Sequence, residues 1–218
     1  MRKVREEGLL ASILRRDPAA RNKVEILLCY PGVHAVIAHR LNHFLYKRGL
    51  KVLSRLGSQF MRIMTGVEIH PGAVIGRRLL IDHGMGVVIG ETAIIGNDVT
   101  IYQGVTLGGT GKDCGKRHPT IGNDVMIASG AKILGPFKIG DHSKIGAGSV
   151  VLKEVPDHCT VVGVPGKIVK QNYKKVDEEK LCDLDQIHLP NPVEREFDAI
   201  RARLEALETE LIKTSSVQ

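Results

Sequence analysis

Aliphatic residues recur at every sixth position across the middle of this chain, and this period constrains the fold more than any other feature. A helix needs apolar residues every three or four positions and a strand needs them every second position, so a period of six fits neither element. The repeat occupies residues 66–170 in three series, which are Ile69, Ile75 and Ile81; Ile89, Ile95, Ile101 and Leu107; and Ile121, Ile127, Ile133, Ile139, Ile145 and Val151.

This spacing is typical of the hexapeptide repeat of a parallel β-helix. Three hexads form one triangular coil, the aliphatic side chains point inward, and successive coils hydrogen-bond at about 4.8 Å. Glycine commonly follows the aliphatic residue, and a small or aliphatic residue often stands four positions after it. The chain has no Trp and only 4% aromatic residues, so its core must be aliphatic. The sequence therefore predicts a mainly β protein whose central domain is a prism.

Helical segments are predicted on both sides of the repeat. Residues 1–65 form an expected N-terminal helical domain, with apolar residues at helical spacing after a break at Pro31-Gly32. Residues 171–218 form a C-terminal extension with a predicted helix at 192–213. Spacings of four and three in this helix favour a coiled coil between subunits over a helix docked on its own domain. The residues at those spacings are Val193, Phe197, Ile200, Leu204, Leu207 and Leu211.

Composition narrows the classes of partner. The net charge of +7 fits either an anionic partner, such as a phosphorylated cofactor, or an ordinary solvated surface. No basic run is interleaved with aromatic residues, so we expect no nucleic-acid partner. No apolar run approaches the roughly 20 residues of a membrane span, and the N-terminus lacks a signal-peptide core, so we expect a cytoplasmic protein. Four widely spaced cysteines are typical of free thiols.

The sequence GGTGKDCGKRHPT, residues 108–120, interrupts the repeat. An insertion cannot lie inside the stack of coils, so it must project from a corner as a loop, and loops on rigid scaffolds often carry function. Its glycines leave backbone N–H groups accessible, and its basic side chains suit an anionic ligand. The spacing of a phosphate-binding P-loop is missing.

Acidic and histidine side chains cluster in the first coils, at Glu68, His70, Asp82 and His83. Positions 68 and 83 are 15 residues apart, close to the 18 of a full coil, so they could lie near each other on adjacent coils. A carboxylate beside a histidine makes a general base. The alternative is that these side chains are solvent-exposed on the outer face of the prism and have no catalytic role.

Seven motifs, in order from about residue 10 to about residue 170, resemble those of the bacterial serine O-acetyltransferases, a family of hexapeptide-repeat acyltransferases. The combination of DHGMG, GGTGK and RHP is much more specific than the repeat alone. The motifs are RDP at 16–18, VEIHPGAVIG at 67–76, IDHGMGVVIGET at 81–92, VTLGGTGK at 105–112, RHP at 117–119, IGAGSVV at 145–151 and GVPGK at 163–167.

The resemblance implies acetyl-CoA-dependent O-acetylation of L-serine to O-acetyl-L-serine and CoA, the first step of cysteine biosynthesis from serine. It implies His83 as the general base and Glu68 as its carboxylate partner, where some members have Asp. The serine-binding positions of the family are matched by Asp17, Asp82, Arg117 and His118. These types suit the chemistry, because arginine pairs with a carboxylate in fork geometry and the hydroxyl must lose its proton during attack.

The resemblance further implies a left-handed β-helix that assembles as a homotrimer and, through the helical domain, as a dimer of trimers. Acetyl-CoA would be a co-substrate in the groove between two prisms, with L-cysteine as a feedback inhibitor and no metal ion. The family's complex with cysteine synthase uses a tail ending in isoleucine, whereas this chain ends KTSSVQ, so we do not expect that complex. The acetyl-CoA contacts would include Gly109, Lys112, Ser129, Ala147 and Lys167.

Three other functions stay open at this point. The acceptor could be a sugar, which the amino-acid-binding set disfavours, or homoserine, which residue types do not exclude. A trimeric zinc β-helix enzyme would need three histidines at a subunit interface, such as His70, His83 and His118, but the expected H-x-x-x-x-H spacing is absent. A structural or assembly protein would leave the projecting loop and the DH and RHP motifs without a purpose.

Overall fold

The computed structural model describes residues 7–111 and 114–171, together with Phe197, Ile200, Arg201, Arg203, Leu204 and Leu207. Four helices come first, α1 (Leu9–Arg16), α2 (Lys23–Cys29), α3 (Pro31–Lys47) and α4 (Lys51–Thr65). Pro31 occupies the first turn of α3, where the N–H that proline lacks has no helical partner. Gly66 ends α4 in the left-handed conformation that glycine adopts without strain.

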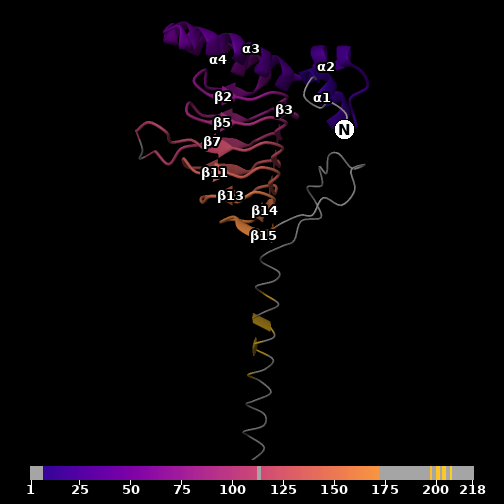
Figure 1. The fold of residues 1–218 in the computed structure, drawn as a ribbon, viewed down its shortest axis with the longest axis vertical. Helices are drawn as coiled ribbons and strands as arrows, with labels where there is room; N and C mark the ends of the chain where they lie inside the picture. Colours follow the sequence, from indigo (N-terminus) through magenta and orange to yellow (C-terminus); the bar gives the residue numbers. More distant parts are fainter. Residues whose placement is uncertain are drawn as a thin grey trace, which may run out of the picture.

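Short strands then wind into three sheets (Figure 1). Sheet 1 contains β1 (Glu68–Ile69), β4 (Val88–Ile89), β7 (Thr106–Gly108), β10 (Lys132–Leu134) and β13 (Val150–Val151). Sheet 2 contains β2 (Val74–Ile75), β5 (Ile94–Ile95), β8 (Thr120–Ile121) and β11 (Lys138–Ile139). Sheet 3 contains β3 (Leu80–Ile81), β6 (Thr100–Ile101), β9 (Met126–Ile127), β12 (Lys144–Ile145), β14 (Cys159–Val162) and β15 (Lys167–Gln171).

The strands pair in the order of a parallel β-helix, because from β1 to β13 each strand lies beside the strand three further along the chain. All pairs are parallel except β14 with β15, which is antiparallel. The hexad aliphatics form one continuous core, in which Ile133, Ile139 and Ile145 are fully buried. The small residues four positions further on, such as Ala131 and Ser149, are also fully buried at the turns. The predicted parallel β-helix is confirmed.

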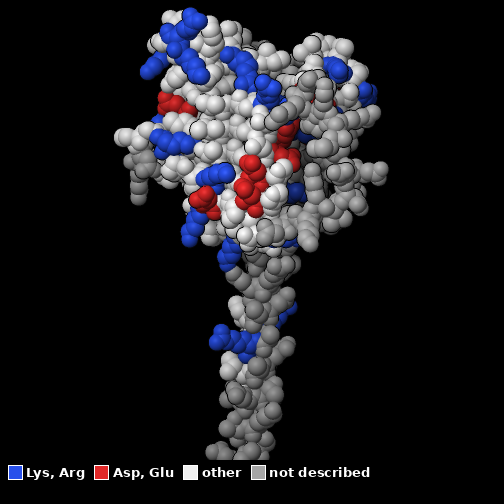
Figure 2. All heavy atoms as spheres, viewed as in Figure 1, with Lys and Arg blue, Asp and Glu red and all other residues white. Residues whose placement is uncertain are grey.

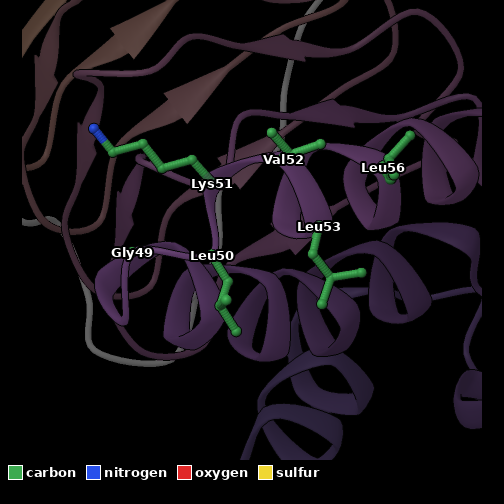
Figure 3. A pocket seen from close by; sticks show the side chains of 6 residues that line it. All are labelled: Gly49, Leu50, Lys51, Val52, Leu53 and Leu56. Atoms are coloured by element: carbon green, nitrogen blue, oxygen red, sulfur yellow. The ribbon is translucent and has the colours of Figure 1, made fainter.

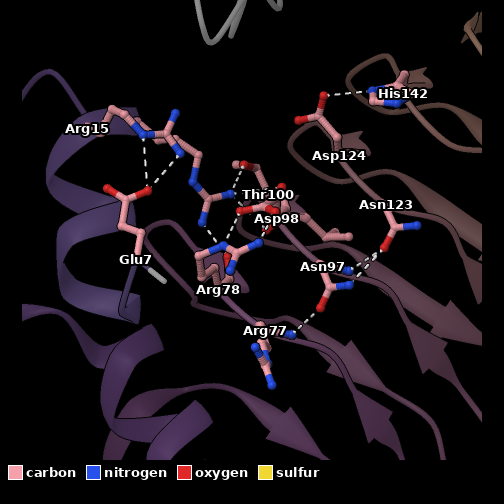
Figure 4. A network of polar contacts seen from close by, with 12 residues as sticks. Glu7, Arg15, Arg77, Arg78, Asn97, Asp98, Thr100, Asn123, Asp124 and His142 are labelled. Carbon is pink, nitrogen blue, oxygen red and sulfur yellow. Dashed lines mark hydrogen bonds and ion pairs between the residues drawn. The ribbon is translucent and has the colours of Figure 1, made fainter. Parts of the chain in front are cut away.

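The turns between sheets form three edges of the prism, which we call edge 1–2, edge 2–3 and edge 3–1 after the sheets that they join. Edge 2–3 is held by polar contacts from one coil to the next (Figure 4). Asn97 Oδ1 accepts the Arg77 N–H at 2.8 Å, and Asn123 Oδ1 accepts the Asn97 N–H at 2.9 Å. Asp124 and His142 pair at 2.8 Å. These residues hold successive coils together along edge 2–3.

One turn of edge 3–1 is longer than its counterparts. Residues 82–87 join β3 to β4, whereas the equivalent turn at 146–149 has two residues fewer. The first coil is therefore 20 residues long, and Glu68 pairs with Val88. The coil of 18 residues expected from the repeat does not apply here, and His83 lies in the turn that carries the additional residues.

Helices α3 and α4 lie across one end of the prism (Figure 1). The side of α4 that meets the prism is polar: Ser54 and Ser58 are buried, and Ser58 Oγ donates to the Ile69 carbonyl at 2.6 Å. The opposite side is apolar, with Phe60 61% and Ile63 81% exposed. This helix is amphipathic with its apolar side outward, the reverse of the usual arrangement.

Stability is expected to fall in mild acid because α3 buries a histidine. His39 is 3% exposed, and burial, followed by the positive charges of His43 and Arg40, lowers its pKa to about 4. In the unfolded chain a histidine takes up its proton near pH 6.5. The native state loses stability as pH falls from about 6.5 to about 4, by up to roughly 3 kcal/mol. Urea unfolding at pH 7 and pH 5 measures this loss, and His39→Leu should reduce it while His34→Leu should not.

The division of the chain into domains at 65/66 and 170/171 stays a prediction. The helices end at Thr65 and the first strand begins at Glu68. Most of the predicted helix at 192–213 lies outside the described residues. The six that are described there are helical and exposed, including Phe197 and Leu204 of the predicted seam.

Candidate active site

His83 projects from the long turn of edge 3–1. Its backbone is in the left-handed conformation, with φ 58°, which is uncommon outside glycine, and its side chain is 74% exposed. Asp82 lies beside it, with Oδ2 3.9 Å from His83 Nε2. Burial raises the pKa of the Asp82 carboxyl, His83 acts in the opposite direction, and the negative charge of Asp17 adds to the rise. An accessible imidazole therefore stands next to a half-buried carboxyl group.

Asp17 reaches the same edge from the end of α1. Its Oδ1 accepts the Ala19 N–H at 2.8 Å, and its Oδ2 accepts the Tyr30 hydroxyl at 2.6 Å. Burial, and then the hydrogen bond to Asp17, raises the pKa of Tyr30 far above its ordinary value, so the phenol stays a donor. Asp17 and Asp82 thus present two carboxylates to one space, an arrangement suited to an ammonium group. Sequence reasoning identified both acids but missed Tyr30.

Arg16 fixes Asp17 to the prism. Its side chain is buried, and NH1 donates to the Asp98 carbonyl at 2.9 Å and to Thr100 Oγ1 at 3.1 Å. NH2 contacts the Arg78 carbonyl on the preceding coil. The first residue of the RDP motif is therefore an anchor, which allows the second to present its carboxylate at a fixed position.

Glu68, the predicted partner of His83, begins β1 in sheet 1. Its Oε2 lies 3.3 Å from NH1 of Arg62 in α4. Within residues 7–111 and 114–171, no hydrogen bond or ion pair joins Glu68 to His83. The Glu68–His83 dyad stays a prediction.

Arg117 lies at edge 1–2, near the end of the projecting loop that joins β7 to β8. Its NH2 pairs with Glu91 Oε2, and Tyr46 of α3 donates to the other oxygen, Oε1, at 2.8 Å. These hydrogen bonds, from Tyr46 first and Arg117 second, hold the pKa of Glu91 below its ordinary value. The helical segment thereby holds the arginine through one carboxylate. Tyr46 and Glu91 were missed because they stand 45 residues apart with no shared period.

His118 lies next to Arg117 and is 8% exposed. Its ring covers Gly90, where a Cβ would overlap the imidazole, so only glycine leaves room for it. Burial, followed by the positive charges of Arg117 and Lys116, lowers the pKa of His118. At neutral pH this imidazole is uncharged, which makes it a hydrogen-bonding group beside a permanent cation.

The predicted acetyl-CoA residues divide between the two edges. Ser129 and Ala147 lie in successive turns of edge 3–1, joined by the Gly148 N–H to the Ser129 carbonyl at 2.8 Å. Lys167 pairs with Val162 where β14 reaches the same edge. Gly109 lies at edge 1–2 beside Arg117, and Lys112 lies outside the described residues. Edge 3–1 therefore carries small residues in line with the turn of His83.

The two groups of polar residues lie at opposite edges of sheet 1. Asp17, Asp82 and His83 are on edge 3–1, whereas Arg117 and His118 are on edge 1–2. The strand residues between Val87 and Gly90 alone span about 10 Å. Within residues 7–111 and 114–171, no hydrogen bond or ion pair joins His83 to Arg117.

Charged side chains, thiols and possible metal ligands also lie elsewhere in the described residues. In the view of Figure 2, Lys and Arg are spread over the helices and the prism with Asp and Glu among them, so the positive charge does not gather in one patch on this face. In the described part of the chain, His, Cys, Asp and Glu form no group of three that could hold a metal. Cys29 and Cys114 are exposed free thiols, and Cys159 is buried. No helix of the described residues is long and apolar enough to span a membrane.

Comparison with known proteins identifies relatives of the repeat domain and of most of the chain. Residues 118–153 match the family model "Bacterial transferase hexapeptide (six repeats)". The serine acetyltransferase of Bacillus pumilus is 56% identical over 204 residues, which cover 94% of this chain and 92% of that protein. The left-handed parallel β-helix predicted from the sequence is the fold that these similarities support.

Solved structures resemble the chain at similar identity. Neisseria gonorrhoeae serine acetyltransferase in complex with serine has a TM-score of 0.72 at 49% identity, covering 74% of this chain and 66% of that chain. Serine acetyltransferase from Brucella abortus in complex with coenzyme A has a TM-score of 0.74 at 45% identity, covering 75% and 66%. This chain therefore spans about two thirds of the length of these solved chains.

Proposed function

The chain belongs to the serine acetyltransferase family, and we propose that it builds its active site from two copies, one contributing edge 3–1 and the other edge 1–2. It transfers the acetyl group of acetyl-CoA to the hydroxyl of L-serine, giving O-acetyl-L-serine and CoA. The observation that carries the two-copy site is the separation of His83 from Arg117 across sheet 1. Edge 3–1 carries residues suited to the ammonium and hydroxyl groups of serine, and edge 1–2 carries residues suited to its carboxylate.

The residues of edge 3–1 suit the ammonium and hydroxyl groups of serine. Asp17 and Asp82 accept hydrogen bonds from the ammonium group. His83 takes the hydroxyl proton as the oxygen attacks the thioester carbonyl, and it then protonates the departing thiolate of CoA. The half-buried Asp82 beside it favours the charged imidazolium formed between the two steps. Glu68 is proposed as a second carboxylate for this purpose, once its side chain leaves Arg62.

The residues of edge 1–2 suit the carboxylate of serine and the oxyanion of the tetrahedral intermediate. Arg117 offers its guanidinium fork to the serine carboxylate, and His118 lies beside it as a neutral hydrogen-bonding group. The Gly109 N–H makes no hydrogen bond within the described residues, so it is free to stabilise the oxyanion of the tetrahedral intermediate. These roles require that edge 1–2 of one copy faces edge 3–1 of its neighbour.

A three-fold ring satisfies this requirement for every copy. Each prism presents both edges, so a head-to-tail contact that closes after three copies gives three identical sites. Acetyl-CoA would lie along the groove between two prisms. The turns of edge 3–1 from residue 83 to Lys167 span about 19 Å along the prism, at 4.8 Å per coil. This length leaves room for the extended arm of acetyl-CoA. Ser129 and Ala147 leave that path open, and Lys167 ends it with a positive charge suited to a phosphate.

A second contact, between two trimers, would cover the apolar side of α4. The groove at the turn between α3 and α4 has a volume of about 450 Å³ and is lined by Gly49, Leu50, Lys51, Val52, Leu53 and Leu56 (Figure 3). This face lies at one end of the prism, so three copies of it share one end of a trimer and meet three others end to end. We propose a second trimer as its occupant.

Disrupting this face should separate the trimers. Ile63 is 81% exposed, and Ile63→Lys places a charge in the proposed contact, so the mass in solution is expected to halve from six chains to three. Val24→Lys, at another exposed apolar position, is the matched control and should leave the mass unchanged. Light scattering after size exclusion measures both. A wild-type mass of three chains would contradict the end-to-end contact.

Four further expectations stay predictions. They are the coiled coil at 192–213, feedback inhibition by L-cysteine, a cytoplasmic location, and the lack of a complex with cysteine synthase.

The reaction is tested by release of free CoA thiol from acetyl-CoA. L-serine, L-homoserine and a panel of sugars serve as acceptors, and O-acetyl-L-serine is identified in the products. We expect turnover with L-serine, because Asp17, Asp82 and Arg117 match an amino acid and not a sugar. Turnover with homoserine alone would keep the reaction class and overturn the acceptor.

A further inference from the structure

We propose that Thr92 is a positioning residue, whose hydroxyl holds the imidazole of His118 in the neutral form that carries its proton on Nε2. The role of His118 in acetyl transfer rests on the proposed function, whereas the proton position follows from the contacts of Thr92. The consequence is that His118 acts in the site as a donor to an anionic oxygen.

The hydroxyl of Thr92 connects the turn after β4 to the end of the projecting loop. Thr92 Oγ1 accepts the backbone N–H groups of Arg117 at 3.0 Å and His118 at 3.1 Å. It also lies 2.9 Å from His118 Nδ1. Backbone N–H groups can only donate, so both use lone pairs of the oxygen. The one hydroxyl proton is therefore left for Nδ1.

A second donor converges on the same nitrogen. The Thr92 backbone N–H lies 3.2 Å from His118 Nδ1. A nitrogen that faces an N–H and an O–H accepts, so Nδ1 carries no proton. A neutral imidazole then bears its proton on Nε2, whereas an imidazolium would point its Nδ1–H at the N–H and O–H of Thr92. Burial and the nearby cations lower the pKa of His118 and act in the same direction.

The other ring nitrogen of His118, Nε2, lies beside Gly90. Nε2 makes no hydrogen bond within the described residues, and the ring lies over Gly90 beside Arg117. The Nε2–H is thus a donor next to a guanidinium, a pair suited to a carboxylate or to the oxyanion of the reaction. Had Nδ1 carried the proton, Nε2 would present a lone pair and repel an anionic oxygen.

A merely structural role for Thr92 is the rival explanation, because the same hydroxyl ties down the loop end. A double-mutant cycle separates the two. Thr92→Val removes the hydroxyl at constant shape and should lower kcat/KM for L-serine about 30-fold, since the partner of a buried polar group is lost. Thr92→Ser keeps the hydroxyl and should stay within about threefold of wild type. In a His118→Ala background, Thr92→Val should add less than about a twofold loss.

The proton position is measured directly by ¹⁵N NMR of histidine-labelled full-length protein, with the His118 signals assigned by their loss in His118→Gln. We expect a protonated Nε2 and a bare Nδ1 at pH 7 in wild type and in Thr92→Ser, and a changed pattern in Thr92→Val. A protonated Nδ1 in wild type would overturn the proposal, as would a Thr92→Val loss that is equal with and without His118. If wild type does not acetylate serine, the proposed function fails and the NMR pattern alone decides the role of Thr92.

Discussion

Replacing His83 with alanine is expected to lower kcat for serine acetylation by about three orders of magnitude, within the range of general-base catalysis. The serine hydroxyl is a weak nucleophile, and His83 is the exposed imidazole of the edge that holds Asp17 and Asp82. The KM values for serine and acetyl-CoA should change little, because the remaining binding residues are intact. Steady-state kinetics with both substrates varied measure this split.

His142→Ala is the matched control for this experiment. His142 is an exposed histidine with the same left-handed backbone, φ 58°, but it lies on edge 2–3. Alanine at either position meets the same backbone strain, so only the loss at His83 reports on catalysis. Equal losses in the two variants would place the effect in the fold and remove His83 from the mechanism.

Replacing Arg117 with alanine is expected to raise the KM for L-serine about 100-fold, the effect of losing hydrogen bonds to a charged group. Glu91 holds the guanidinium through NH2, which orients the fork before serine binds. Arg117→Lys keeps the charge and loses the fork, so its KM should lie between those of wild type and Arg117→Ala. The KM for acetyl-CoA should stay within about twofold of the wild-type value, because most of acetyl-CoA is proposed to lie along edge 3–1.

Arg77→Ala removes the same charge from an exposed position on edge 2–3 and should leave both KM values unchanged. A rise in the serine KM there would indicate a general electrostatic effect of the +7 chain. An unchanged serine KM in Arg117→Ala would contradict the role of edge 1–2.

Much of the fold could be predicted, because a period of six has few solutions. Ile133, Ile139 and Ile145 are where the repeat places them, one on each face and fully buried. The side of α4 that meets the prism could not be predicted, because periodicity identifies an apolar stripe without saying what it faces. Here Ser58 reaches the Ile69 carbonyl, and the stripe points outward.

The site was predicted in part. Motif residues such as Asp17 and Arg117 were identified through the family resemblance, and their roles in the reaction stay predictions. Their supports, Tyr30, Tyr46 and Glu91, were not identified, because long-range hydrogen bonds leave no period in the sequence. The division of the motifs between two edges also follows only from the order of strands in the sheets.

The central claim is that the active site needs two copies of the chain, and co-assembly of two inactive variants tests it most directly. Chains with His83→Ala and chains with Arg117→Ala are unfolded together, mixed in equal amounts, and refolded into random trimers. Every mixed trimer then contains one site in which His83 of one copy meets Arg117 of its neighbour. At a serine concentration below KM, the mixture should recover about a quarter of the wild-type activity by this count. Activity no higher than the mean of the two separate variants would contradict the two-copy site.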